Sequence, residues 1–313
     1  MATTITGTSV TSEGIVTNTL GTSNFVAGVN AGNSITSGGN YNTVVGDEAG
    51  TAITTGDNNT AVGQDALKST TTADHNTAVG QAALYTNTTG TTNTAVGRAS
   101  MYANTTGGAN TAVGYAALNT NTTASNNTAV GYQSLQANTT GVSNVAVGLQ
   151  SLDANTTGGA NVAVGTSALG SNTTASNNVA VGHDALTANT TGNENTAVGY
   201  ESLKSSTTAI RNSAFGNIAL ATNTTGSENT AVGYASMTNN TTGTENTAIG
   251  RSSLQNNTTG DYNVAVGRNA LIQNTTADAN TAVGYYALEV NTTGHENTAN
   301  GYNTLTDNTT GNN

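Results

Sequence analysis

The sequence predicts an all-β protein folded as a parallel β-solenoid, or β-roll, of sixteen 17-residue coils that follow a degenerate first coil. The phrase that runs from Asn110 to Asn126 is repeated sixteen times without slippage from residue 42 to residue 313. A fixed short period indicates a solenoid, because one unit cannot bury its own apolar side and must stack on the next. The 3.6-residue apolar spacing of a helix is missing, and the density of Asn, Thr and Gly opposes a helix.

The chain divides into three parts. Residues 1–23 form a lead whose β-branched segments are bounded by Gly, a pattern typical of short strands that cap a coil or dock on a neighbouring molecule. Residues 24–41 follow the spacing of the later coils with one extra residue and are interpreted as a degenerate first coil. Residues 42–313 are the regular array. Because an array grows along one axis, we expect one elongated unit.

Composition excludes several classes of partner. Only 7% of residues are charged, the net charge is −11, and the six Lys and Arg are scattered, so no basic stripe is available for nucleic acid. Without Cys there is neither a disulfide framework nor a thiolate metal site. No apolar run of about 18 residues predicts a membrane span, and the N-terminus has no visible signal peptide. Work outside a cell would therefore require lysis, a dedicated secretion system or a virion.

The first half of each repeat predicts the core. We number the places of a coil from 1 at Asn110 to 17 at Asn126. Gly114, at place 5, is Gly in all sixteen copies, which indicates a corner that needs positive φ or close backbone approach. Val113 at place 4 and Leu118 at place 9 are apolar in nearly every copy, and we interpret them as two inward columns. Place 8 is always small, since a larger side chain would collide with its neighbours.

The second half of each repeat is polar and equally regular. Thr122 and Thr123 have counterparts in every copy, and Asn precedes the pair in thirteen copies, as Asn121 does. Stacked Asn side chains form amide ladders, and stacked Thr residues line a pleated face. The Asn-Thr-Thr triplets also match N-glycosylation acceptors, but a spacing equal to the coil period favours the ladder.

The thin core favours oligomerisation. Each coil must order 17 residues while burying one Val, one Leu and some Ala. The conformational entropy of ordering exceeds what this burial returns, so backbone pairing, ladders and lateral burial between chains must contribute.

The run Asn-Thr-Ala-Val-Gly-x-x-Ala/Ser-Leu resembles the head repeat of YadA-type trimeric autotransporter adhesins, and similar repeats are expected in phage tail fibres. The resemblance implies a left-handed roll with three chains side by side. The chain departs from the adhesins in its longer coil and in having no coiled-coil stalk and no membrane-anchor barrel. A plain Met start without a signal favours a phage fibre or a secreted filament.

The sequence predicts no catalytic, cofactor or metal site and no enzyme. His75, His183 and His295 lie six or more coils apart along the array and cannot share a site. No nucleophile with a base and no phosphate loop is visible. Glu228 and Glu245 lie at place 17 of adjacent coils and could bind calcium, but the calcium β-roll signature is absent and a solvated edge is the favoured interpretation.

Tyr residues at place 6 are the candidate contact residues. Tyr115 with Tyr132, and Tyr285 with Tyr302, form adjacent-coil pairs. Such rings could stack on sugars, or they could pack against one another on the surface.

These patterns favour a structural subunit of an extracellular or virion-borne fibre or filament. We expect its partner to be itself, as a trimer, a head-to-tail filament or both, with the lead from Thr3 to Thr19 docked on the coil from Asn297 to Asn313 of the next molecule. One alternative is an adhesin or receptor-binding fibre that contacts cell-surface glycans. A less favoured alternative is an ice-binding solenoid, because neighbours such as Thr122 and Thr123 should point to opposite faces and leave one regular column.

Overall fold

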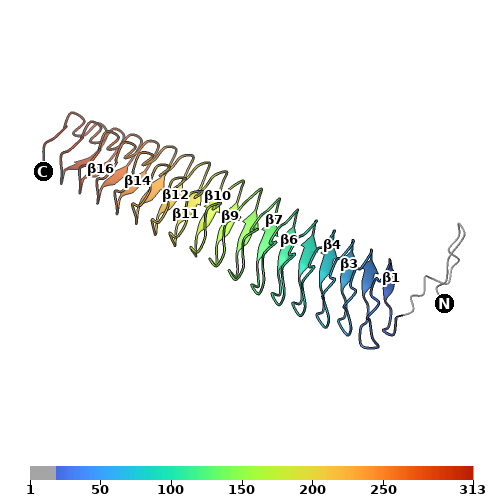
Figure 1. Cartoon of the computed structure of the whole chain (residues 1–313). Coiled ribbons are helices and arrows are strands. Elements are labelled where there is room, and N and C mark those ends of the chain that lie inside the picture. The colour runs from blue at the N-terminus through green and yellow to red at the C-terminus, as the bar shows by residue number, and fades with distance from the viewer. Residues whose placement is uncertain (1–18, 313) are drawn as a thin grey trace, which may run out of the picture.

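The structure, a computed structural model, describes residues 19–312 as one elongated stack of coils (Figure 1). Each coil contributes one short strand, and each strand pairs in parallel with the strand of the next coil to form a single 17-stranded sheet. No helix is present in these residues. The predicted all-β parallel β-solenoid with a 17-residue period is confirmed.

The strands are three residues long and occupy places 2 to 4 of their coils. Their bounds are β1 Phe25–Ala27, β2 Thr43–Val45, β3 Thr60–Val62, β4 Thr77–Val79, β5 Thr94–Val96, β6 Thr111–Val113, β7 Thr128–Val130, β8 Val145–Val147, β9 Val162–Val164, β10 Val179–Val181, β11 Thr196–Val198, β12 Ser213–Phe215, β13 Thr230–Val232, β14 Thr247–Ile249, β15 Val264–Val266, β16 Thr281–Val283 and β17 Thr298–Asn300. Phe25 pairs with Thr43, whereas Thr111 pairs with Thr128, so the coil that starts with β1 holds one extra residue.

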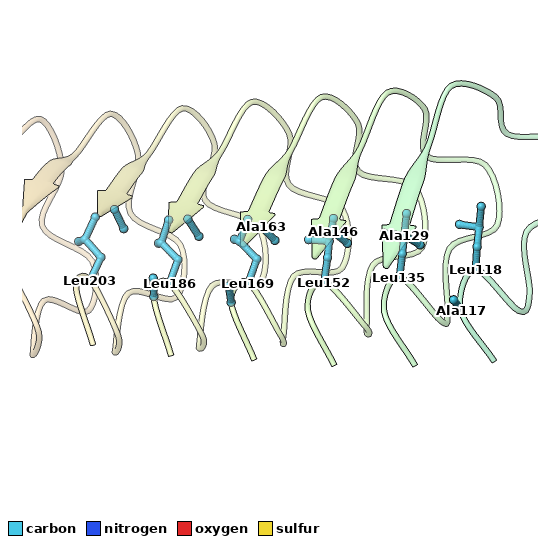
Figure 2. Packing of buried hydrophobic residues seen from close by; sticks show 14 of the residues in the cluster. Ala117, Leu118, Ala129, Leu135, Ala146, Leu152, Ala163, Leu169, Leu186 and Leu203 are labelled. Carbon is cyan, nitrogen blue, oxygen red and sulfur yellow. The ribbon is translucent and has the colours of Figure 1, made fainter. Parts of the chain in front are cut away.

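The middle residue of each strand points into the coil. Ala112 and its counterparts at place 3 are fully buried, and Figure 2 shows Ala129, Ala146 and Ala163 facing the row of leucines. Val113, by contrast, is 36% exposed. Side chains alternate across a strand, so Ala inside forces both flanking residues outside. The prediction of an inward Val column was therefore wrong.

The second predicted inward column is confirmed. Leu118 and its counterparts at place 9 are fully buried in the coils between β3 and β16 and stack in one row (Figure 2). Place 8 is buried beside this row, as at Ala117 and Ser134, which explains why only small residues occur there. The core is thus a single file of Leu or Met against a file of Ala.

Gly114 turns the chain directly after β6. Its φ is 139°, and a Cβ built on it would lie 2.3 Å from the carbonyl oxygen of Gly131. Both the left-handed conformation and the close approach exclude other residues. The predicted reason for the invariant glycine is confirmed.

The rest of the coil is irregular but fully connected to its neighbours. Leu118 N–H donates to the Ser134 carbonyl at 3.0 Å, and Thr122 donates to the Thr139 carbonyl from both its N–H and its hydroxyl, each at 3.2 Å. The chain bends through non-glycine residues with positive φ, among them Leu118 at 51°. These bonds offset a strain of about 1–2 kcal/mol for each such residue.

The predicted Asn ladder runs through the interior at place 12. Asn121 Nδ2 donates to Asn104 Oδ1 at 2.7 Å and to the Ala124 carbonyl at 3.0 Å, and Asn138 Nδ2 donates to Asn121 Oδ1 at 3.1 Å. Asn121 is fully buried, so its amide is not open to glycosylation. Beside it, Thr122 is half-buried and Thr123 is exposed, in line with opposite orientations of the pair.

A second ladder at place 1 was not predicted. Asn110 Nδ2 donates to Asn93 Oδ1 at 3.2 Å and to the Ala124 carbonyl at 2.9 Å, and Asn110 N–H also donates to Asn93 Oδ1 at 3.0 Å. The Ala124 carbonyl therefore accepts a hydrogen bond from one Asn of each ladder. The signal was available, since place 1 is Asn in all sixteen copies.

Candidate interaction face

The outward side of the sheet carries two parallel columns of side chains. We call this surface, formed by places 2 and 4 of strands β2 to β17, the Thr/Val face. Place 2 holds Thr, Val or Ser, and place 4 holds Val except at Phe215, Ile249 and Asn300. No charged residue occurs at either place, although the chain carries a net charge of −11.

The apolar column of the Thr/Val face is open to solvent in a single chain. Val113 is 36% exposed, Phe215 42% and Ile249 41%, and the other place-4 valines from β2 to β15 are partly exposed to a smaller extent. All-parallel sheets occur almost only where both faces are covered, and contiguous apolar surface on a protein usually marks a contact site. At about 4.8 Å per strand the face is a strip roughly 75 Å long and 10 Å wide. That area approaches the roughly 800 Å² that each partner buries in a standard interface.

The predicted Tyr pairs lie on one edge of the solenoid and stack on each other. The ring centroids of Tyr115 and Tyr132 are 5.2 Å apart with an interplanar angle of 12°. The guanidinium carbon of Arg98 lies 5.7 Å from the Tyr115 centroid. Because this column advances one coil at a time in the order Arg98, Tyr115, Tyr132, both faces of the Tyr115 ring have neighbours.

The second predicted pair has the same arrangement. The centroids of Tyr285 and Tyr302 are 5.5 Å apart, and Arg268 lies 5.6 Å from the Tyr285 centroid. Aromatic and cation–π contacts of this kind stabilise neighbouring coils. Stacking on a sugar needs a free ring face, so the geometry favours the packing interpretation for the inner ring of each pair.

Acidic residues at place 16 have a structural role. Asp57 N–H donates to Asp74 Oδ1 at 2.7 Å, and Thr244 N–H donates to Asp261 Oδ1 at 2.6 Å. Each carboxylate therefore accepts from the backbone of the preceding coil. This contact explains their regular spacing without a bound ion.

In the candidate calcium pair, Glu228 already has a cationic partner. Arg211 lies on the coil between those of Glu194 and Glu228, and its guanidinium bridges the two carboxylates, with both N–O distances at 3.0 Å. The hydrogen bond to Glu194, followed in size by the one to Glu228, raises the pKa of Arg211. Glu228 is thereby paired with a cation, and in residues 19–312 no group of three or more His, Asp or Glu side chains is placed to hold a metal ion.

The histidines stay apart, as their sequence positions require. His183 stacks on Tyr200 at 5.6 Å and lies 3.3 Å from Asp184. His295 Nδ1 accepts from the Asp278 N–H at 2.9 Å and so takes the place of a carboxylate on the acidic edge.

No family model and no curated protein matches the chain. Among residues 19–312, no helix has the length and apolarity needed to cross a bilayer. Inference about function therefore depends on the geometry of the solenoid itself.

Sequence reasoning missed the Thr/Val face because it placed Val inside. The signal that could have found it is the alternation at places 2 to 4, where a β-branched residue or Ser precedes Ala and an apolar residue follows in nearly every copy.

Proposed function

We propose that the chain is a structural subunit of an extracellular or virion-borne fibre and that it assembles laterally with copies of itself through the Thr/Val face. The observation that carries this proposal is a parallel sheet whose outer face is uncharged and bears a column of partly exposed apolar residues, nearly all Val. Burying that column in a partner removes apolar surface from water at every coil.

A second copy fits this face better than a different partner does. The face repeats with the coil period, so two copies aligned side by side repeat the same contact along their length. Three rolls can turn this face toward one axis, which agrees with the trimer that the adhesin resemblance implies. Three rolls packed in this way form a rigid shaft, and such a shaft is suited to spanning a distance as part of a fibre.

Head-to-tail assembly remains part of the proposal. Its docking lead, Thr3 to Thr19, falls almost wholly outside the described residues. Deleting residues 2–23 should leave short rods, and long filaments formed by the deletion variant would overturn this docking scheme.

Substitutions on two faces test lateral assembly. In the first variant, Val130→Lys and Val164→Lys place charges on the Thr/Val face two coils apart. In the control, Thr140→Lys and Thr174→Lys place the same charges on exposed residues of the Thr-Thr segment. We expect the first variant to run as a monomer in light scattering while the control keeps the assembled mass. Equal masses for the two variants, both folded by circular dichroism, would contradict the proposal.

Ice binding is the second candidate, favoured by one observation. The strand places two outward columns, such as Thr111 and Val113, two residues apart on a regular sheet, whereas Thr122 and Thr123 do not form such a pair. A monomer would expose these columns to water, and thermal hysteresis at micromolar protein would support this function. An assembled fibre would cover them, so the two functions predict different oligomeric states.

A further inference from the structure

The Asn ladder at place 12 is interrupted in the interior of the solenoid. Residue 206 is Ser where most coils have Asn. Two fully buried side-chain atoms at this interruption have no hydrogen-bond partner, Asn189 Oδ1 and Ser206 Oγ. Within residues 19–312 they are the only buried side-chain atoms of this kind. Unpaired buried polar atoms are rare in folded proteins, and an ordered water commonly satisfies them.

The intact ladder shows which bonds are missing. Asn172 Nδ2 donates to Asn155 Oδ1 at 2.8 Å and to the Ala175 carbonyl at 3.1 Å, while Asn172 Oδ1 accepts from Asn189 Nδ2 at 3.0 Å. Each Asn thus donates twice and accepts once through its carboxamide.

Three groups around residue 206 correspond to those partners. Asn189 Oδ1 and the Ala209 carbonyl would accept from a carboxamide there, and Asn223 Nδ2 would donate to it. The Ala209 carbonyl accepts from Asn195 Nδ2 at 2.8 Å, and Asn223 Nδ2 donates to the Gly226 carbonyl at 2.8 Å, so each retains capacity for one more bond.

We propose that one buried water molecule replaces the missing carboxamide. It donates to Asn189 Oδ1 and to the Ala209 carbonyl, and it accepts from Asn223 Nδ2 and from the Ser206 hydroxyl. These are two acceptors and two donors, the full complement of a water molecule. Ser has two heavy atoms fewer than Asn, and the space is about that of one water, which occupies roughly 30 Å³ in the liquid.

Thr70 provides a matched comparison at the same place. Its Oγ1 donates to the Asn87 carbonyl at 3.1 Å and accepts from Asn87 Nδ2 at 3.3 Å. The Thr hydroxyl is therefore satisfied by the protein alone, and we propose no water at that coil.

A crystal structure of the full chain in which ordered waters are visible tests the site directly. We expect a density peak within hydrogen-bond distance of Asn189 Oδ1 and Ser206 Oγ, and we expect Ser206→Asn to displace it. Hydrogen exchange should then slow by about three- to tenfold for amides of the adjoining coils, since the ladder becomes continuous. In Thr70→Asn, the exchange rates of the amides in its own coil should stay within about twofold of those in the unmodified chain. No peak at Ser206, with its hydroxyl turned to donate to a backbone carbonyl, would overturn the proposal, and so would unchanged exchange in Ser206→Asn.

Discussion

Single residues in this chain are constrained by the coil above and the coil below. The glycine at place 5 is the clearest case, because positive φ and contact with the next coil both act there. At Gly131, φ is 139°, and an added Cβ would lie 2.3 Å from the Gly148 carbonyl oxygen.

We therefore expect Gly131→Ala to lower the stability of the chain. Strain in this conformation costs about 1–3 kcal/mol before any displacement of the next coil. The control is Gly141→Ala. An added Cβ there would lie 2.2 Å from the Gly158 carbonyl oxygen, a similar approach, but φ is not in the left-handed region and Ala occupies that place in five coils, Ala124 among them. Thermal unfolding should show a larger loss for the first variant, and an equal loss in both would contradict the account of the corner.

Asp153 gives a prediction about pH. Burial raises the pKa of Asp153, and the backbone N–H groups of Asp153 and Ala154 offset only part of that rise. A raised pKa means that the fold favours the protonated acid, so this contribution to stability is lost as pH rises through the folded-state pKa. Asp153→Asn should then be slightly more stable than the unmodified chain at pH about 7 and equal to it at pH about 3, below the ordinary Asp pKa. Thermal unfolding at both values checks this, and a gain of the same size at both would contradict it.

At the scale of the element, the two Asn ladders supply stabilisation that a larger hydrophobic core would otherwise supply. The ladder at place 1 connects each coil to the next, and the ladder at place 12 does so except where Ile53, Thr70 or Ser206 replaces Asn.

Asn121→Ala tests the ladder. The change leaves Asn104 Oδ1 buried without its donor, and an acceptor of that kind costs about 1–3 kcal/mol. Asn126→Ala is the control, since Asn126 is exposed and Ala109 holds the same place with similar φ. Denaturation should show a clear loss only for Asn121→Ala; a neutral effect at this residue would mean that the ladder contributes little.

Much of each element could be predicted from the repeat itself. Gly114, Leu118, the small residue at place 8 and the ladder at Asn121 were predicted because each holds one kind of residue through most copies. Val113 was placed wrongly because hydrophobicity ranks Val above Ala, whereas strand alternation decides which side faces in. The positive φ of Leu118 could not be predicted, because its side chain carries no preference for that conformation and the contacts between coils impose it.

The candidate site was harder to predict than the fold. Tyr115 and Tyr132 were predicted to be exposed and adjacent, and they are, but their stacking geometry depends on side-chain positions in successive coils. The pairing of Glu228 with Arg211 also depends on where two long side chains meet across coils.

At the scale of the whole molecule, one chain leaves a parallel sheet uncovered on one side. The Thr/Val face is continuous, uncharged and partly exposed, and it runs from β2 to β17. The proposed lateral assembly would cover it at every coil and would make a shaft stiffer than one thin roll.

The mass of the unmodified chain in solution tests this account most directly. Sedimentation equilibrium over a range of concentrations should give a multiple of the 31.0 kDa chain mass, and three times that mass for the proposed trimer. A stable 31.0 kDa monomer at every concentration would contradict lateral assembly through the Thr/Val face.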